Sequence, residues 1–239
     1  MRRATLNLTL MAGLVAAAGS ASAGGVDVRI GGFFPRGGDT FFQDLNSLYT
    51  PDANPNHGVG ARDFDGVFGG VEYNTVIFPN VELGVSLDGY GRTADSSYRN
   101  YTREGGGEIR QSLQLDMVPL GATLRLIPTG KHVPVAPYVG VGVDAIFYSY
   151  EEHGDFVDFQ DPALTVYSDH FRDSGTAFGV HALAGVRVYL NRDFAIVGEG
   201  RYQWAKKDMG EDFAPNGPGL VNRLDLSGAS VTIGVHVRF

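Results

Sequence analysis

Few of the residue types that perform catalysis lie together in this 239-residue chain. Ser168, Asp169 and His170 adjoin one another, but a catalytic triad is defined by the geometry of its side chains and not by adjacency. The sequence has no Gly-x-Ser-x-Gly turn, no His-Glu-x-x-His pair and no glycine-rich phosphate loop. Because it also lacks Cys, thiol nucleophiles, disulfides and Cys-ligated metals are excluded. We therefore expect a protein that is not an enzyme and that carries no metal or cofactor.

Carboxylates dominate the segment 151–173, where Arg172 is the only Lys or Arg among Glu151, Glu152, Asp155, Asp158, Asp161, Asp169 and Asp173. Such oxygens can bind divalent cations, but their spacing does not match a calcium-binding EF-hand loop. We expect a solvated acidic loop and keep cation binding as the alternative. The net charge of -8 argues against a nucleic-acid partner, since phosphates are bound by basic residues.

The first 23 residues have the pattern of a secretory signal peptide. Arg2 and Arg3 precede an apolar stretch, and Ala21-Ser22-Ala23 supplies the small residues of a cleavage site. A retained membrane anchor is the alternative, but the apolar stretch is shorter than the roughly 20 residues that a spanning helix needs. We expect cleavage after Ala23 and a single domain over residues 24–239.

The remaining sequence alternates between apolar and polar residues with the two-residue period of β-strands. Val81, Leu83 and Val85 share one face of such a strand, for example, and no later segment shows sustained helical periodicity. The pattern predicts an all-β protein with eight strands, at residues 26–34, 67–77, 81–92, 111–126, 135–150, 176–190, 194–205 and 224–239.

The connections between these strands differ in length in a regular way. Residues 78–80 and 191–193 form tight turns and 127–134 a moderate one, whereas the other four connections are long. Such long loops are unusual in compact soluble domains. Short periplasmic turns opposite long extracellular loops are typical of outer-membrane β-barrels, in which the strands run antiparallel in an up-and-down order.

One face of most strands is almost entirely apolar, and the other carries most of the charge. Val139, Val141 and Val143 alternate with Gly140, Gly142 and Asp144 in this way. In a soluble barrel the apolar face would fill the core, and periodicity alone allows that arrangement. The export signal, the loop lengths and the aromatic residues favour a membrane barrel whose apolar face meets lipid.

Aromatic residues on the apolar face lie near the strand ends. Phe194 and Trp204 are ten residues apart, which is about 33 Å along a strand and roughly 25 Å across a tilted barrel. That distance is the height expected of the lipid-facing band. We predict that the band is bordered by an aromatic girdle that consists of Phe34, Phe147, Phe178, Phe194, Tyr202 and Trp204, with Phe239 at the lower edge.

The predicted strand 111–126 changes phase in its middle. Leu113, Leu115 and Met117 share one parity, whereas Leu120 and Leu124 have the other. An inserted residue near Met117 would reset the pleat, and the adjacent Pro119 is tolerated where a ladder is interrupted. We therefore predict a β-bulge at 117–118.

The segments PYVGVGVDAIFY and AGVRVYLNRDFAIVGEGRYQW, and the ending SVTIGVHVRF, resemble the small eight-stranded bacterial outer-membrane barrels of the opacity-protein and OmpA/OmpX-like superfamily. The resemblance covers residues 24–239 and implies an outer-membrane location in contact with lipid and lipopolysaccharide. In that superfamily the barrel-assembly machinery reads a terminal aromatic residue and the apolar residues before it. Val235, Val237 and Phe239 match this signal.

The polar face would then line the lumen of the barrel. By parity it contributes Arg29 and a predicted charge network of Glu72, Glu82, Asp88, Asp116, Arg125, Asp144, Arg187, Glu199, Arg201 and Arg238. Eight strands enclose a space that side chains can fill, and unpaired charges in it would be costly. A salt-bridged plug is therefore favoured over an ion path.

Two classes of function remain. The favoured one is a structural or interaction protein, similar to adhesins, whose long extracellular loops contact a partner. The alternative is a narrow conduit for small, hydrophobic solutes, as in OmpW-like members of the superfamily.

Overall fold

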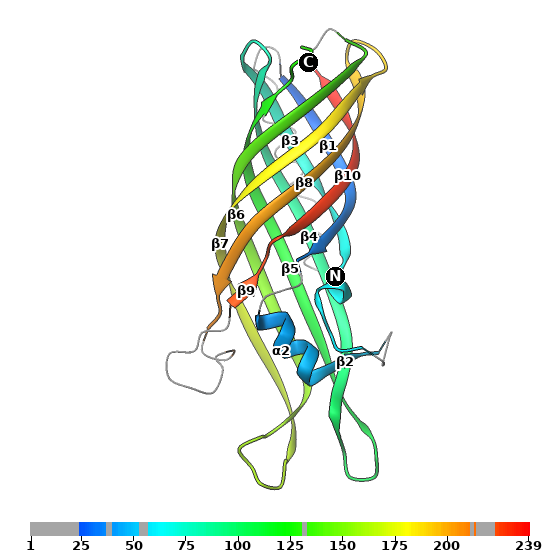
Figure 1. Ribbon diagram of the computed structural model, residues 1–239, viewed down its shortest axis with the longest axis vertical. Coiled ribbons are helices and arrows are strands. Elements are labelled where there is room, and N and C mark those ends of the chain that lie inside the picture. The colour runs from blue at the N-terminus through cyan, green and yellow to red at the C-terminus, as the bar shows by residue number, and fades with distance from the viewer. Residues whose placement is uncertain (1–23, 37–39, 53–56, 131–132, 211–212, 214–222) are drawn as a thin grey trace.

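The computed structural model describes residues 24–36, 40–52, 57–130, 133–210, 213 and 223–239. The predicted signal peptide, residues 1–23, lies outside these described residues. Eight strands pair side by side into a closed antiparallel ring (Figure 1). In ring order they are β1 (Gly24–Pro35), β3 (Gly66–Phe78), β4 (Val81–Thr102), β5 (Glu108–Leu126), β6 (Val135–Val157), β7 (Val166–Tyr189), β8 (Phe194–Asp208) and β10 (Gly228–Arg238), and β10 closes on β1.

Short turns gather at one end of the barrel, which we call the turn end, and the chain ends there too (Figure 1). At the opposite hairpin end, the strands β4 to β7 run far beyond the others as two long hairpins. The eight predicted strands are all present, but the expected long loops after residues 92 and 150 are largely strand. The predicted last strand is divided into β9 (Arg223–Asp225), which pairs with β8, and β10.

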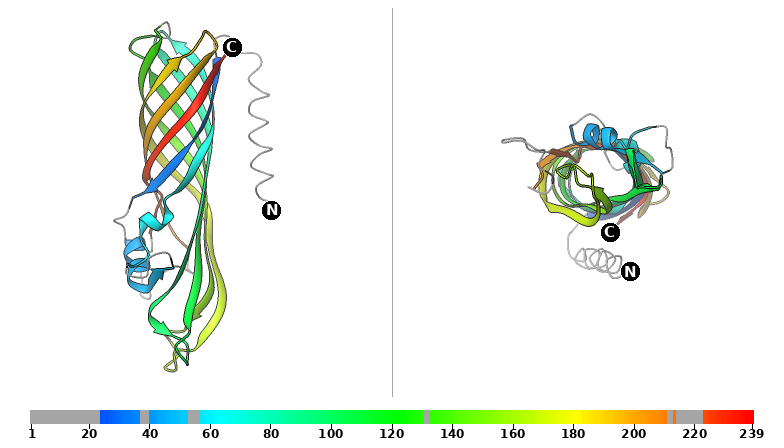
Figure 2. Two further views of the ribbon diagram at one scale, coloured as in Figure 1. Left: turned by 90° about the vertical axis from the view of Figure 1, so that its right-hand side faces the viewer. Right: turned by 90° about the horizontal axis from the view of Figure 1, so that it is seen from below.

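A short helix, α2 (Thr40–Leu48), covers the inner side of the long hairpins (Figures 1 and 2). It is followed by strand β2 (Tyr49–Pro51), which pairs with β4, and by the 3-10 helix η1 (Ala61–Phe64). The sequence did not indicate α2, because no segment after residue 23 shows sustained helical periodicity. Phe41, Phe42 and Tyr49 of this covering are only 2 to 4% exposed because they belong to the buried apolar cluster.

Strand β5 has no bulge at 117–118, so that prediction is wrong. Its pairing with β6 runs without a shift from Gln111↔Gly154 to Leu126↔Val139. Leu113, Leu115 and Met117 point into the barrel, whereas Leu120 and Leu124 point outward. The change of phase in the sequence reflects an interior that changes from apolar to polar along one regular strand.

Outward-facing apolar side chains surround the barrel between its two ends. We call them the apolar belt, and they include Val28, Ile30, Val85, Leu120, Leu124, Val139, Val141, Val143, Val180, Val231, Ile233 and Val235. Five of the predicted girdle residues, Phe34, Phe147, Phe178, Phe194 and Trp204, are 45 to 79% exposed at the borders of this belt. Tyr202 is half-buried, and its ring centre lies 4.6 Å from that of Trp204. No helix among the described residues is long and apolar enough to cross a membrane.

Candidate functional site

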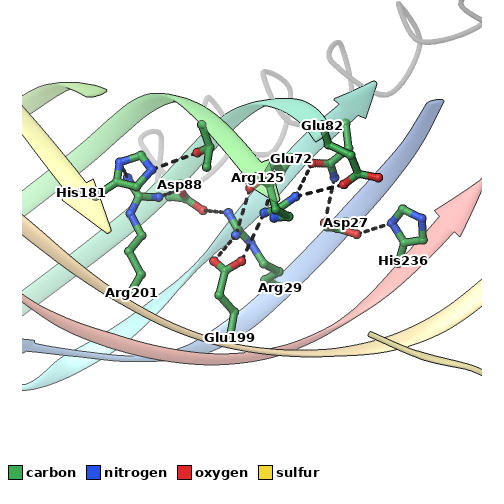
Figure 3. Close-up of polar contacts among 12 residues, drawn as sticks. Asp27, Arg29, Glu72, Glu82, Asp88, Arg125, His181, Glu199, Arg201 and His236 are labelled. Atoms are coloured by element: carbon green, nitrogen blue, oxygen red, sulfur yellow. Dashed lines mark hydrogen bonds and ion pairs between the residues drawn. The ribbon is translucent and has the colours of Figure 1, made fainter. Parts of the chain in front are cut away.

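The lumen between the belt residues contains a layer of charged side chains, which we call the charged layer (Figure 3). Small residues on the inward face make room for it. A Cβ atom on Gly185 would lie 2.4 Å from the ring of Tyr138, and one on Gly142 would lie 2.5 Å from the ring of His181. These two glycines make room for Tyr138 and His181, which are their direct partners on the adjacent strand of the β6–β7 pair.

Arg29 and Arg125 form the centre of the charged layer. Arg29 on β1 lies 2.6 Å from Glu199, 3.1 Å from Glu72 and 3.2 Å from Asp88. Arg125 on β5 lies 2.8 Å from Glu72 and 3.3 Å from Glu199. Each guanidinium therefore joins carboxylates from several strands, and the two share Glu72 and Glu199.

Toward the turn end, Arg187 joins two further carboxylates. It lies 2.7 Å from Glu82 and 3.1 Å from Asp27. Asp27 also accepts a hydrogen bond from Asn74 and lies 2.5 Å from Nδ1 of His236. The side chain of Tyr138 lies between Arg125 and Arg187, with its ring centre 4.6 and 5.4 Å from their guanidinium carbons, and its hydroxyl donates to Glu199.

Toward the hairpin end, Arg201 joins Asp88 to Asp144. Asp144 is 2.7 Å from Nδ1 of His181, whose Nε2 is 2.9 Å from the hydroxyl of Thr123. These contacts are those of a catalytic triad, but Thr123, His181 and Asp144 are 1 to 3% exposed. A substrate cannot reach this hydroxyl, so we assign the arrangement to packing of the lumen.

The charged layer is almost completely buried. Its six carboxylates and four guanidiniums are at most 5% exposed, and they belong to Asp27, Glu72, Glu82, Asp88, Asp144, Glu199, Arg29, Arg125, Arg187 and Arg201. Charges removed from water at this depth need partners and hydrogen bonds to persist. The four guanidiniums, together with the rings of His181 and His236 beside Asp144 and Asp27, supply those partners.

Two residues of the predicted network lie elsewhere. Asp116 is on the outer wall, where it faces Ser149 and Gly91 on neighbouring strands and accepts a hydrogen bond from Gln114. The predicted bulge at 117–118 put Asp116 on the lumen face of the strand. Because the strand is regular, Asp116 lies on the outer face instead. Arg238 is at the turn end, where its guanidinium carbon lies 4.8 Å from the centre of the Tyr189 ring.

Sequence reasoning missed several members of the layer. Asp27 has the same parity as Arg29, and this signal was available in the alternation of β1. Asn74, Thr123 and Tyr138 are uncharged, so a search for charges did not find them. Their roles follow only from the contacts across the lumen.

A second layer, the aromatic layer, fills the lumen on the hairpin side of the charges. It consists of Phe33, Phe68, Tyr90, Leu113, Leu115, Met117, Ile146 and Tyr148, all at most 5% exposed. Phe41, Phe42 and Leu45 of α2 continue the same apolar cluster outward, and the ring of Phe41 packs edge-on against Tyr150. The interior is therefore filled from the charged layer to the helix.

One carboxylate lies within this outer apolar region. Glu152 on β6 is 7% exposed, and it accepts hydrogen bonds from the hydroxyls of Tyr150 at 2.7 Å and Tyr49 at 3.4 Å. Burial raises the pKa of Glu152 above its usual range, although both hydroxyls oppose this shift. Burial, and next to it the carboxylate of Glu152, raise the pKa of Tyr49 and Tyr150 as well.

The acidic segment that was expected to be a loop belongs mainly to the β6–β7 hairpin. Asp155 pairs with Arg103 of the neighbouring hairpin, and Glu151 pairs with Arg172 and His170. Among the described residues, no group of three or more His, Asp or Glu side chains is arranged to hold a metal ion.

Comparisons with known proteins agree with this architecture. A family model described as the outer membrane protein beta-barrel domain matches residues 5–239. The chain belongs to this family. It is therefore a protein of the bacterial outer membrane. No curated protein sequence matches the chain significantly.

Two solved structures illustrate the shared fold. OprG from Pseudomonas aeruginosa is 12% identical, and the alignment covers 93% of this chain and 98% of OprG with a TM-score of 0.53. Neisserial surface protein A is also 12% identical, with coverage of 92% and 98% and a TM-score of 0.50. At this identity the similarity concerns the fold alone.

Proposed function

We propose that this protein is a closed barrel that serves as a rigid surface scaffold, and that its extracellular hairpins contact a partner. The observation that carries the proposal is the filled lumen, in which a charged layer and an aromatic layer follow one another. A water-filled path through the charged layer would require several ion pairs to separate. Removing one partner of a buried pair typically costs about 3 to 5 kcal/mol, so the closed state is strongly favoured.

Planar lipid bilayers provide the test. We expect the purified barrel to show no large, steady conductance. Arg201→Met should lower the free energy of unfolding far more than it raises the conductance, because it leaves Asp144 without a guanidinium and Asp88 with only that of Arg29. Arg192→Met, on an exposed turn residue, is the matched control. A large current in the wild type, with ion selectivity that changes in Arg201→Met at unchanged stability, would overturn the scaffold function.

We also propose that residues 1–23 direct export and that Val235, Val237 and Phe239 are read by the barrel-assembly machinery. The side chains of Val235 and Phe239 are about half exposed on the outer face of β10 and the C-terminus, at 47 and 51%. Deletion of Phe239 should leave export intact and reduce the amount of folded, protease-resistant barrel in outer-membrane fractions. Undiminished assembly would show that Phe239 is not part of such a signal.

A conduit for small hydrophobic solutes is the second candidate, and a feature of the wall favours it. Pairing between β4 and β5 stops at Leu87↔Leu120 and resumes in the same register at Tyr90↔Met117. The intervening Pro119 has no backbone N–H to donate. A groove of about 700 Å³ lies on the outer wall here, and Tyr90 and Met117 of the aromatic layer contribute to its lining. A solute that entered the aromatic layer would leave through the wall between β4 and β5 into the membrane, since the charged layer blocks the way to the periplasm.

A cross-link across this interruption tests the conduit. The chain has no Cys, so Gly89→Cys with Val118→Cys introduces one unique pair at facing positions of β4 and β5. If solutes cross here, oxidation should stop the flux of a hydrophobic fluorophore into liposomes, and reduction should restore it. The same flux before and after oxidation, or no flux at all, would rule out this conduit.

A further inference from the structure

The two long hairpins separate near their tips and leave a cleft between them. Pairing between β5 and β6 ends at Gln111↔Gly154, although β5 begins at Glu108 and β6 continues to Val157. Gly154 has φ +141°, and a Cβ atom there would lie 2.4 Å from the carbonyl oxygen of Arg110. Only glycine accommodates this bend, so Gly154 determines where the hairpins part (Figure 1).

The cleft has a volume of about 650 Å³ and an apolar floor. Ile109 and Val157 are 1% and 5% exposed at its base, and Tyr101 and Leu164 line its sides. The rim is formed by Thr102, Arg103, Glu104 and Thr165. Both the volume and the combination of an apolar floor with a few polar groups are typical of ligand sites.

Contacts between the hairpins hold the cleft open in a fixed shape. Arg103 of one hairpin forms an ion pair with Asp155 of the other. The ring of Phe159 lies 5.3 Å from Tyr101 and 6.2 Å from Tyr98, which both belong to β4. These contacts join the two hairpins, so the cleft exists before any ligand arrives, and binding does not have to organise it.

Leu164 is held in an unfavourable backbone conformation at the edge of the cleft. Its φ is +51°, a region that bulky residues rarely adopt. The turn enforces it, because the Leu164 N–H donates to Asp161 and the Asp161 carboxylate accepts from Ala163 and Thr165. Strain that is maintained in this way clusters at functional sites. Here it holds an apolar side chain, 42% exposed, beside the opening.

The charge around the cleft selects the ligand. Arg103 is neutralised by Asp155, and Arg110 by Glu108. Glu104, Asp158 and Asp161 then leave the tips with an excess of negative charge. A ligand that suits both the floor and the rim carries aliphatic side chains next to basic ones.

The walls of the cleft suggest the form of that ligand. Glu108 and Arg110 of β5 pair only with β4, and residues 155–157 of β6 pair only with β7. Their facing edges border the cleft, and the Val157 N–H donates to the hydroxyl of Tyr98 across it. Main-chain groups at such strand ends bind extended peptides by adding a strand.

We propose that this cleft binds an extended peptide segment of another protein, in which aliphatic residues alternate with Lys or Arg. The proposal rests on the surface-scaffold function and names the class of partner that its hairpins recognise. The aliphatic side chains would contact Ile109, Val157 and Leu164, and a basic side chain would pair with Glu104.

Fluorescence anisotropy of the full-length barrel in nanodiscs, with a labelled peptide of alternating Val and Lys, tests the proposal. We expect saturable binding that is weakened about tenfold by Leu164→Asn, which keeps the backbone conformation but removes the apolar contact. Glu104→Gln should weaken binding up to about fivefold. Asp193→Asn removes an exposed carboxylate from the turn at the opposite end of the barrel and should change nothing.

Control peptides separate specific binding from adsorption. A peptide with Glu in place of Lys should not bind, and backbone N-methylation should abolish binding if strand addition contributes. Equal binding of the wild type, Leu164→Asn and Glu104→Gln would overturn the proposal, as would binding of oligosaccharides in place of peptides. Bilayer conductance of the same preparation distinguishes failure of the peptide site from failure of the scaffold function. A barrel that neither conducts ions nor binds the peptide refutes only the peptide site. A barrel that conducts ions refutes the scaffold function.

Discussion

The charged and aromatic layers fill the same lumen by opposite physical means. In the charged layer, each guanidinium joins carboxylates of several strands, so removal of one group leaves others buried without a partner. In the aromatic layer, side chains such as Leu115 and Met117 contact one another without directional bonds. The first arrangement depends on every member, and the second tolerates changes of shape.

The outward-facing residues change in the opposite sense. They are apolar where the lumen is charged, and polar where the lumen is apolar. Strand β5 shows this along its length, since Arg125 faces inward and Leu124 outward near the turn end. Nearer the hairpin end, Leu113 faces inward and the half-buried Gln114 outward. One regular strand is thus a membrane strand in one half and a strand of a soluble protein in the other. The comparison teaches that the surroundings of the barrel determine the chemistry of its interior.

The largest expected effect is in the charged layer. Arg125→Met should lower the free energy of unfolding by about 3 to 5 kcal/mol, because it leaves Glu72 and Glu199 short of a cation in a fully buried position. Urea unfolding in detergent micelles, followed by the heat-dependent shift in gel mobility, measures this change. A loss below about 1 kcal/mol would show that water enters the layer and replaces the missing partner.

A matched change in the aromatic layer sharpens the contrast. Leu113 is completely buried, so Leu113→Ala should lower the free energy of unfolding by about 2 to 5 kcal/mol through lost contacts and a residual cavity. Leu113→Met nearly conserves the volume and should cost less than about 1.5 kcal/mol. If Leu113→Met were as harmful as Leu113→Ala, the two layers would not differ in their tolerance.

The inversion of the outer face can be tested on one strand. Val141 is 61% exposed in the apolar belt, so Val141→Arg should lower the free energy of unfolding by about 2 to 4 kcal/mol in a bilayer. His153 points outward from the same strand β6 beyond the belt, and His153→Arg should change it by less than about 0.5 kcal/mol. Equal effects at the two positions would place the membrane border elsewhere.

The smallest expected effect concerns pH and the hairpin end. Because the pKa of Glu152 is raised in the folded protein, the native state binds this proton more tightly than the unfolded state. The stabilisation is fully present below the unfolded pKa and is lost as the pH rises through the raised value. The protection of α2 from proteolysis should therefore decline over that window in the wild type, and Glu152→Gln should flatten the decline. An identical pH profile in both proteins would assign the decline to another group.

The barrel could be predicted from the sequence because apolar and polar residues alternate along many strands, and contact with lipid requires the apolar residues on the outer face. The sequence did not predict α2, since nine residues with three buried apolar side chains are too short to establish a helical period. The predicted bulge failed for a related reason: parity was interpreted as if the lumen had a single chemistry throughout. Glu152 was assigned to a solvated loop because a run of acidic residues does not show that β6 continues through it. It also does not show that α2 covers this part of the strand.

The position of Arg29 and Asp27 on the first strand has a consequence for the order of folding. These two side chains contact Glu72, Asp88, Arg187, Glu199 and His236, which belong to strands from β3 to β10. Until the first and last strands meet, Glu199 and Arg187 therefore lack these partners and must remain hydrated. Expulsion of water from the lumen is then coupled to ring closure, which makes the last pairing event the one that commits the chain to its native topology.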